Sequence, residues 1–317
     1  MLPLVIVNPR SAAGATREKW SAIASDLRTH FGPFNVAFTK GPGDGIELAK
    51  RAVASGRRLV LACGGDGTIN EVANGILQTG EDVEFGVLPS GTGGDFRRTI
   101  GMPNGIRECA RALREGRTRT IDVGRVTFCG HDGEQASRFF VNVSSFGLAA
   151  SILDRVKTTT SLKWLPVDRV RGRASFALST LQEVLDLDPV TVRVSIDGEA
   201  AQNLRTVNFC IANARYFGGG MMIAPEAKLG DGLLNVVNIG DIAAAKVLLN
   251  AHTLYRGTHG SLSEVNERLA KRIEVSSADP NVEIRLETDG ELPGRLPAIY
   301  EVVPSALKIR VPAPANE

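Results

Sequence analysis

Two short glycine-rich stretches hold the residues of this sequence that are best suited to chemistry. The first is Gly64-Gly65-Asp66-Gly67-Thr68, which follows an apolar run at 59–62 and precedes a helical pattern. Glycines let the backbone approach a bound group closely, and a helix N-terminus aims unpaired N–H groups at an anion. We therefore expect a nucleotide phosphate here, with Asp66 indicating a reaction or a metal. A tight turn without a ligand is the alternative.

The second stretch is Pro89-Ser90-Gly91-Thr92-Gly93-Gly94-Asp95, and it follows the next apolar run, at 85–88. Turns after successive parallel strands lie side by side at the sheet edge where α/β proteins bind ligands. Neither stretch has the Gly-Lys-Ser/Thr ending of a Walker A loop or the GxGxxG spacing of a dinucleotide fingerprint. We therefore expect a metal or basic residues elsewhere to meet the phosphate charge.

Three later stretches are weaker candidates. They are the glycine-rich 213–221, the Asp231-Gly232 pair within 225–234, and Thr288-Asp289-Gly290-Glu291. A bulge or a turn explains each of them, whereas the functional alternatives are a cation held at Asp231 and a general base at 288–291. The four histidines share no metal-ligand spacing, and no Ser/His/Asp triad is evident.

Alternating strand and helix patterns in the first third must position the two glycine stretches. Near-continuous apolar strands at 4–7, 35–39, 59–63 and 85–88 predict a parallel sheet covered on both faces. Helices are expected at 16–30, 44–55 and 69–77, the first with Thr16 as its N-cap.

Period-two alternation dominates beyond about residue 121. The clearest strand is 190–196, with a turn at Asp197-Gly198 and a return strand expected at 206–212; the pattern recurs at 282–287. Helices are expected at 174–187 and 241–255. We predict a Rossmann-like α/β domain over 1–122, to which 303–317 returns, and an antiparallel β-sandwich domain over 123–302.

Composition limits the classes of function. The chain has 317 residues, 43% hydrophobic and 23% charged, with a net charge of +2, so nucleic acid is not an expected partner. Four scattered cysteines favour a reducing compartment, and no apolar segment approaches the roughly 20 residues that span a bilayer. A cytoplasmic protein is the expectation.

Taken in order, these stretches resemble the catalytic family of diacylglycerol kinases, which includes sphingosine and ceramide kinases. The resemblance begins at Asn8-Pro9-Arg10-Ser11, passes through both glycine stretches and Ile121-Asp122-Val123-Gly124, and ends at Thr288-Asp289-Gly290-Glu291. The first glycine motif is shared with NAD kinases and phosphofructokinases, whereas the pattern over 213–234 is that of the lipid kinases.

The resemblance implies an ATP- and Mg²⁺-dependent kinase that transfers the γ-phosphoryl group to a lipid hydroxyl. It implies Glu291 as general base and an acidic network of Asp66, Asp95 and Asp122 that places the catalytic magnesium. A structural magnesium would bind Asp231 and the carbonyls of Lys228 and Leu233. The implied ATP-site residues are Asn8, Thr39, Gly64, Gly65, Asp66, Gly67, Thr68, Ile69, Asn70, Gly91 and Thr92.

Two residues depart from the family pattern: Gly94 stands where Asn is usual, and Ser90 where an apolar residue or glycine is usual. The backbone role survives both changes, while a side-chain contact to nucleotide or metal is put in doubt. Two other functions stay open: an NAD-kinase-like phosphotransferase on a similar scaffold that acts on a soluble substrate, and a non-catalytic nucleotide-binding regulatory protein, which Gly94 supports best.

The segment Arg155–Arg173 has six basic residues, one acid and Trp164. Transient docking on an anionic leaflet and a solvated loop packed on the second domain are equally good interpretations. An antiparallel edge strand could also pair in a homodimer.

Overall fold

The computed structural model describes residues 1–91, 93–158 and 180–313, and these form two units. Unit 1 comprises Met1–Val123 and the chain from Val303 onward, and unit 2 comprises Gly124–Val302. Strands β5 (Arg117–Gly130) and β15 (Glu291–Val311) each contribute residues to both units.

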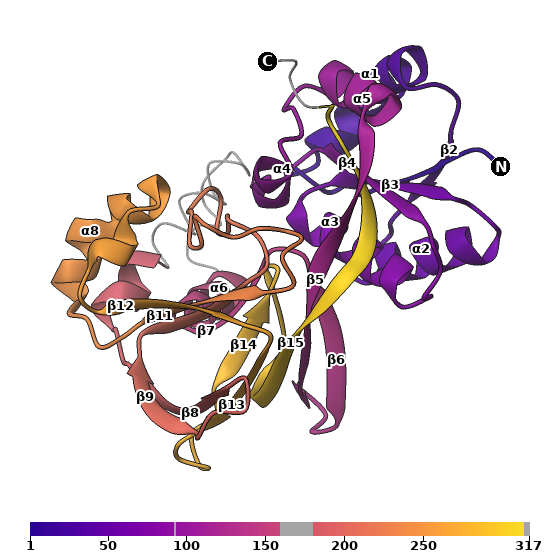
Figure 1. Ribbon diagram of the computed structural model, residues 1–317. Coiled ribbons are helices and arrows are strands. Elements are labelled where there is room, and N and C mark those ends of the chain that lie inside the picture. The colour runs from indigo at the N-terminus through magenta and orange to yellow at the C-terminus, as the bar shows by residue number, and fades with distance from the viewer. Residues whose placement is uncertain (92, 159–179, 314–317) are drawn as a thin grey trace. The chain divides into compact units, whose positions relative to one another are not determined.

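Unit 1 is built on a parallel sheet with the strand order β15-β4-β3-β1-β2. Every residue of β1 and β3 is buried, as expected for strands covered on both faces. Figure 1 shows α1 and α5 on one face, and α2 and α3 on the other. The strands not yet bounded are β1 (Leu4–Val7), β2 (Asn35–Phe38), β3 (Leu59–Gly64) and β4 (Glu84–Pro89). The helices are α1 (Ala15–His30), α2 (Asp44–Ala54), α3 (Asp66–Leu77), α4 (Asp95–Thr99) and α5 (Ile106–Glu115).

Unit 2 is a sandwich of antiparallel strands in two layers that share β15. One layer has the order β12-β11-β10-β7-β14-β15, and β13, β8 and β9 extend from β15 in the other. The remaining strands are β6 (Gln135–Phe140), β7 (Val143–Gly147), β8 (Val190–Ile196), β9 (Gln202–Thr206), β10 (Asn208–Ala212), β11 (Leu234–Ile239), β12 (Val265–Ala270), β13 (Arg272–Ser277) and β14 (Arg285–Thr288). The helical elements are α6 (Leu148–Thr158), a helix over 180–185, α8 (Ala244–Arg256) and the 3₁₀ turn η1 (His259–Ser261).

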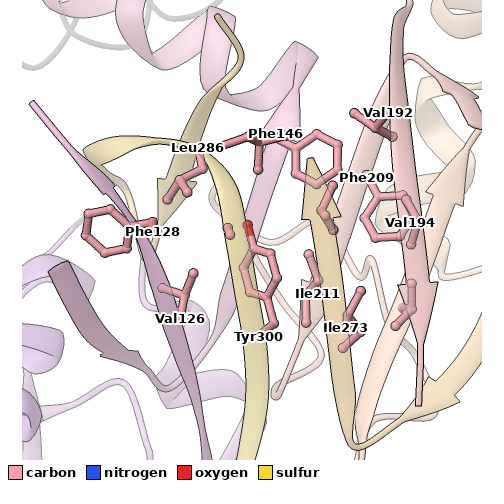
Figure 2. Close-up of a cluster of buried hydrophobic side chains, with 14 of the residues drawn as sticks. Val126, Phe128, Phe146, Val192, Val194, Phe209, Ile211, Ile273, Leu286 and Tyr300 are labelled. Carbon is pink, nitrogen blue, oxygen red and sulfur yellow. The ribbon is translucent and has the colours of Figure 1, made fainter. Parts of the chain in front are cut away.

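The core of unit 2 lies between these layers (Figure 2). The rings of Phe146 and Phe209 stack with centroids 5.1 Å apart, and Tyr300 of β15 is fully buried among the same side chains. Inward-facing residues alternate with outward-facing ones, as in the burial of Val192 and Val194 on β8. The predicted combination of a parallel α/β domain with an antiparallel β-sandwich is confirmed.

One strand pairing differs from the expectation. The strand that returns from the Asp197-Gly198 turn is β9, Gln202–Thr206, and not 206–212. Residues 208–212 form β10, which is buried along its whole length and pairs with β7 and β11 in the other layer. A continuous apolar run is typical of a central strand, whereas the half-exposed β9 is a typical hairpin partner.

The expected cap of the first helix is also wrong. Helix α1 begins at Ala15, and its cap is Gly14, with φ 86° and no side-chain hydrogen bond. Thr16 is buried inside the first turn, where its hydroxyl group contacts other segments. Of the helix expected at 174–187, the described part is helical over 180–185. No helix among the described residues combines the length and apolarity needed to cross a bilayer.

Candidate functional site

The two glycine stretches of unit 1 lie in direct contact. They follow β3 and β4, which are parallel neighbours, and Ser90 N–H donates to the Gly64 carbonyl at 2.9 Å. A Cβ added to Gly91 would lie 2.5 Å from the Gly65 Cα, so a side chain at position 91 would separate the turns. The predicted side-by-side arrangement is confirmed, while Thr92 lies outside the described residues.

Asp66 holds the second turn to the first. Its carboxylate accepts hydrogen bonds from Gly94 N–H at 2.8 Å and Phe96 N–H at 3.1 Å, which are donors at the start of α4. The second acid, Asp95, is buried and forms an ion pair with Arg98 at 2.8 Å. Arg98 is thus a basic residue beside the second turn that the sequence did not single out, and its guanidinium group is paired with Asp95.

The backbone conformation at Gly94 explains why glycine can replace the asparagine that is usual in the family. It caps α4 in the left-handed conformation, with φ 68° and ψ 36°. Glycine adopts this region freely, and asparagine is among the few other residues that enter it readily. Glycine thus preserves the turn, while the amide group of an asparagine side chain is lost.

The first loop of the chain joins the same end of the sheet. Asn8 follows β1 and donates from Nδ2 to Thr68 Oγ1 at 3.0 Å, which brings together two of the predicted nucleotide-site residues. Thr39 follows β2 and its N–H donates to the Val7 carbonyl. Ile69 and Asn70 lie within α3 with both side chains buried. The Asn70 Oδ1 atom accepts a hydrogen bond from Asn74 Nδ2 at 3.2 Å, so one contact of the Asn70 side chain lies within the helix.

Three hydroxyl groups link the first loop to the second glycine turn. Ser11 Oγ and Thr16 Oγ1 are 2.6 Å apart, and Thr16 Oγ1 is 2.5 Å from Ser90 Oγ. This chain gives Ser90 a role that an apolar residue could not fill. Sequence reasoning missed it because Ser90 is 74 residues from Thr16 along the chain.

A second missed contact joins α3 to α2. The Glu71 carboxylate accepts hydrogen bonds from Gly43 N–H at 2.8 Å and Gly45 N–H at 2.9 Å. These donors belong to the open N-terminus of α2, which otherwise has no side-chain cap. Glu71 is therefore a long-range cap, and only its place five residues after Asp66 connects it to the glycine motif.

The remaining predicted acid of unit 1, Asp122, is buried on β5 and accepts a hydrogen bond from Ser305 N–H at 2.7 Å. Asp66 and Asp95 approach one another around Gly93, where an added Cβ would lie 2.6 Å and 3.9 Å from their Oδ2 atoms. Within residues 1–91, 93–158 and 180–313, no three His, Cys, Asp or Glu side chains are gathered as a metal site. Both of these carboxylates therefore lie near Gly93, whereas Asp122 is engaged with β15.

Cys63 is the buried residue of β3 that precedes the glycines of the first turn. Burial raises the pKa of its thiol to about 12, with a further contribution from Cys109. A thiol with so high a pKa is protonated at neutral pH and is a poor nucleophile. Cys63 is therefore a core residue and not a participant in covalent chemistry.

In unit 2, the turn at Asp289-Gly290 joins β14 to β15. Both residues have positive φ, 47° and 87°, as in a type I′ hairpin. The buried Asp289 carboxylate accepts three backbone hydrogen bonds, from Val141, Asn142 and Val143, at 2.8 to 3.0 Å. The predicted turn is confirmed, and Asp289 binds the β6–β7 connection to it.

Glu291, the first residue of β15, has a different environment. Its Oε2 atom forms an ion pair with an Arg138 guanidinium nitrogen at 2.7 Å, and 35% of its side chain is exposed. Arg138 lies on β6 and is 17% exposed. Glu291 is therefore reachable, and Arg138 sets the direction of its carboxylate.

The segment around Asp231 forms a set of tight turns. A bridge between Phe217 and Met221 closes the triple-glycine loop, and Asp231 Oδ1 accepts a hydrogen bond from Leu233 N–H at 3.1 Å. Asp231 and Lys228 are exposed. The hydrogen bond observed for Asp231 is thus part of a local turn, which is the simpler of the two explanations given from the sequence.

Most of the basic segment Arg155–Arg173 lies outside the described residues, Trp164 included. Arg155 itself is described, and it forms ion pairs with Glu183 and Asp186. Its charge is therefore already met by one carboxylate of the helix at 180–185 and one directly after it.

Comparisons with known proteins agree with this architecture. Residues 3–126 match the model of the diacylglycerol kinase catalytic domain, and residues 142–311 match that of the YegS C-terminal NAD kinase beta sandwich-like domain. A crystal structure of a diacylglycerol kinase from Bacillus anthracis superposes with a TM-score of 0.69, covering 98% of this chain and 96% of the other, at 21% identity. That likeness concerns the fold.

Similar curated proteins carry the same name. A diacylglycerol kinase of Mycobacterium tuberculosis is 30% identical over 311 residues, which cover 97% of this chain and 94% of the relative. A diacylglycerol kinase of Bacillus subtilis is 26% identical over 301 residues, covering 93% and 91%. The match of both family models in order, together with this identity along nearly the whole chain, shows that the protein belongs to the diacylglycerol kinase family of kinases.

Proposed function

We propose that this protein transfers the γ-phosphoryl group of ATP to the hydroxyl group of a lipid such as diacylglycerol, with Mg²⁺ as the metal. The observation that carries the proposal is the contact between the two glycine turns of unit 1, where three loops converge at the carboxyl ends of parallel strands. Backbone N–H groups at such an edge suit a polyphosphate.

The nucleotide would bind against the backbone of the two turns, with Asn8, Thr39 and Thr68 at the edge of the site. Arg98 supports this placement because its charge lies beside the second turn. The residues proposed to contact ATP are Asn8, Thr39, Gly64, Gly65, Asp66, Gly67, Thr68, Ile69, Asn70, Gly91 and Thr92.

Magnesium fits the carboxylates that converge at Gly93, because hard oxygen donors are the ligands it prefers. Asp66 and Asp95 would hold the ion and Asp122 would orient the surrounding segment. When bound, the ion would supply charge stabilisation to the transferring phosphoryl group. A second, structural magnesium is proposed at Asp231 with the carbonyl groups of Lys228 and Leu233.

Glu291 is proposed to accept the proton of the lipid hydroxyl. The new bond forms between that oxygen and the γ-phosphorus, the bond from the γ-phosphorus to the bridging oxygen breaks, and ADP leaves. The exposure of the Glu291 carboxylate supports this role, because a base must come within hydrogen-bond reach of the proton.

The test is a screen of the purified protein with labelled ATP and a panel of lipids in detergent micelles. The panel contains diacylglycerol, phosphatidylglycerol, a sphingoid base and a polyprenol, with NAD as a soluble control. Labelled product from a lipid, lost when Mg²⁺ is chelated, is the expected result. Labelling of NAD alone would favour the NAD-kinase-like alternative, and ATP binding without turnover on any acceptor would favour a regulatory protein.

Location and assembly belong to the same proposal. A kinase with a lipid acceptor must meet a membrane surface at least transiently, so a cytoplasmic protein that docks peripherally is proposed. A homodimer formed through an antiparallel edge is proposed as well, and sedimentation analysis of the purified chain tests it.

A further inference from the structure

Helix α8 of unit 2 exposes large apolar side chains to solvent, which is unusual for a helix that only covers a protein core. None of its 13 residues, all of them described, is buried. Its outward face nevertheless carries large apolar side chains: Leu248 is 43% exposed, Leu249 76% and Tyr255 58%. Surface helices normally turn such residues inward and polar residues outward.

The exposed positions follow a helical stripe. Ala245, Leu248, Leu249, His252 and Tyr255 are all exposed, at the spacing of one face of an α-helix. The opposite side makes the contacts with the protein: Leu254 packs on the buried cluster around Ile223, and its carbonyl accepts a hydrogen bond from Met222 N–H at 2.7 Å. The stripe is therefore a property of a helix with a defined orientation and not of a frayed one.

The charges of the helix have one sign. Residues 244–256 include Lys246 and Arg256 and contain no Asp or Glu. Arg256 is exposed at the end of the apolar stripe, and Lys246 pairs with Glu264 outside the helix. An exposed arginine at the end of an apolar stripe that includes a tyrosine is typical of helices that lie in the plane of a membrane interface.

We propose that the outward face of α8, defined as Ala245, Leu248, Leu249, His252, Tyr255 and Arg256, docks on an anionic bilayer. This rests on the proposed function, because a lipid substrate brings the protein to a bilayer. Charge complementarity favours a bilayer over a second copy of the chain: a second α8 would bring further cations and no carboxylate, whereas lipid phosphates pair with Arg256. Arg155 of the basic segment is already paired, so α8 offers the better-defined surface.

The test is sedimentation of the full chain with vesicles of phosphatidylcholine mixed with phosphatidylglycerol, without ATP. The variant L248E/L249E places two carboxylates on the stripe. The matched control is L269E/V282E, which changes two apolar residues of unit 2 outside α8 with comparable exposure, 51% and 47%. We expect the L248E/L249E partition coefficient to fall about tenfold or more and that of the control to stay near wild type.

Thermal unfolding of both variants tests whether each is folded. We expect both to fold, because all four substituted side chains are exposed. Equal vesicle binding by wild type and L248E/L249E would overturn the proposal. So would a wild-type dimer that becomes a monomer in L248E/L249E without loss of vesicle binding, because the face would then belong to a second copy.

Turnover separates this proposal from the proposed function. L248E/L249E should phosphorylate a dispersed short-chain lipid as wild type does and lose activity only on lipid held in vesicles. If wild type binds vesicles through α8 yet phosphorylates no lipid, the docking surface stands and the kinase assignment fails. If wild type phosphorylates lipid but the α8 substitutions do not affect vesicle binding, the kinase assignment stands and the docking surface fails.

Discussion

Each unit contains a turn in which a glycine adjoins an aspartate, and in both turns the aspartate accepts backbone hydrogen bonds. Asp66 in unit 1 accepts backbone hydrogen bonds from Gly94 and Phe96, and Asp289 in unit 2 accepts three from 141–143. In both, the aspartate of the glycine motif fixes a neighbouring segment. The difference lies in burial: Asp289 is 7% exposed and fully engaged, whereas Asp66 faces a turn with a second carboxylate nearby.

In each unit, a second acid near the aspartate is paired with an arginine. Asp95 pairs with Arg98 and Glu291 pairs with Arg138. A carboxylate bound to backbone N–H groups cannot leave them without orphaning buried donors, whereas one paired with a flexible arginine can exchange partners at lower cost. The comparison gives Asp289 a structural role and is consistent with the chemical role proposed for Glu291, while Asp66 has a structural role beside the chemical one proposed for it.

The largest expected effect comes from Glu291→Gln. Removing a general base should lower turnover about 10²- to 10⁴-fold, with ATP affinity nearly unchanged. Unfolding free energy should change by less than about 1 kcal/mol, because the ion pair with Arg138 is partly exposed. Steady-state kinetics and denaturant titration measure these quantities.

A matched control is Glu199→Gln, which removes another exposed carboxylate paired with an arginine, Arg268, in the same unit. It should leave turnover at the wild-type level. Normal turnover in Glu291→Gln would show that Glu291 is not the base.

The next effect is structural. Asp289→Ala leaves three buried N–H groups without their acceptor, and each costs about 1 to 3 kcal/mol, so we expect a loss of about 3 kcal/mol or more in unfolding free energy. Asp289→Asn should recover part of it, because one amide oxygen remains and asparagine tolerates the positive φ of this position. Urea unfolding at fixed pH measures both.

Asp197 provides the control for Asp289. It stands in a similar Asp-Gly turn and accepts two backbone hydrogen bonds, from Lys271 and Arg272, but it is exposed. Water can replace its carboxylate, so Asp197→Ala should cost about 1 kcal/mol. Equal losses at positions 289 and 197 would mean that burial does not distinguish the two turns.

Asp66→Asn tests whether the unit 1 turn combines both roles. The amide oxygen can still accept a backbone hydrogen bond, so we expect a stability loss of about 1 kcal/mol. Turnover should fall by about tenfold or more, because the negative charge proposed to place the metal is lost. If the loss of turnover in Asp66→Asn and Asp66→Ala is no larger than their loss of stability explains, Asp66 acts only as a capping residue.

The smallest expected effect concerns pH and unit 2. His259 is buried, its Nε2 lies 3.0 Å from the Ile223 carbonyl, and burial lowers its pKa. Between that lowered pKa and the ordinary value near 6.5, the unfolded chain binds a proton that the folded chain does not. Unfolding free energy should therefore rise with pH across this window and decline as pH falls through it.

Unfolding of His259→Gln measured across this pH range should show a flatter slope than that of the wild type. An identical slope in the two proteins would assign the pH dependence to other groups.

The sequence predicted the parallel sheet and the contact of the glycine turns because both follow from local patterns. Strand periodicity identifies β3 and β4, and parallel neighbours must end at one sheet edge. The turn at Asp289 was likewise predictable from its Asp-Gly pair.

What the sequence could not supply are partners fixed by tertiary packing. Arg138 and Glu291 are 153 residues apart, and nothing in either neighbourhood indicates the other. The cap that Glu71 gives α2 and the placement of β10 in the other layer are of the same kind. Local propensity determines that a strand or helix forms, whereas its neighbours depend on residues far along the chain.

The passage of β15 through both units has a consequence for how the chain folds as it is made. The outer neighbour of β4 pairs with it at Lys308 and Ile309, so the ribosome delivers this strand long after β4 itself. Until then β4 offers a free row of N–H and C=O groups to other nascent chains. A gene fragment ending at residue 123 would keep that hazard permanently, and co-expression with the missing strand should restore a well-behaved product.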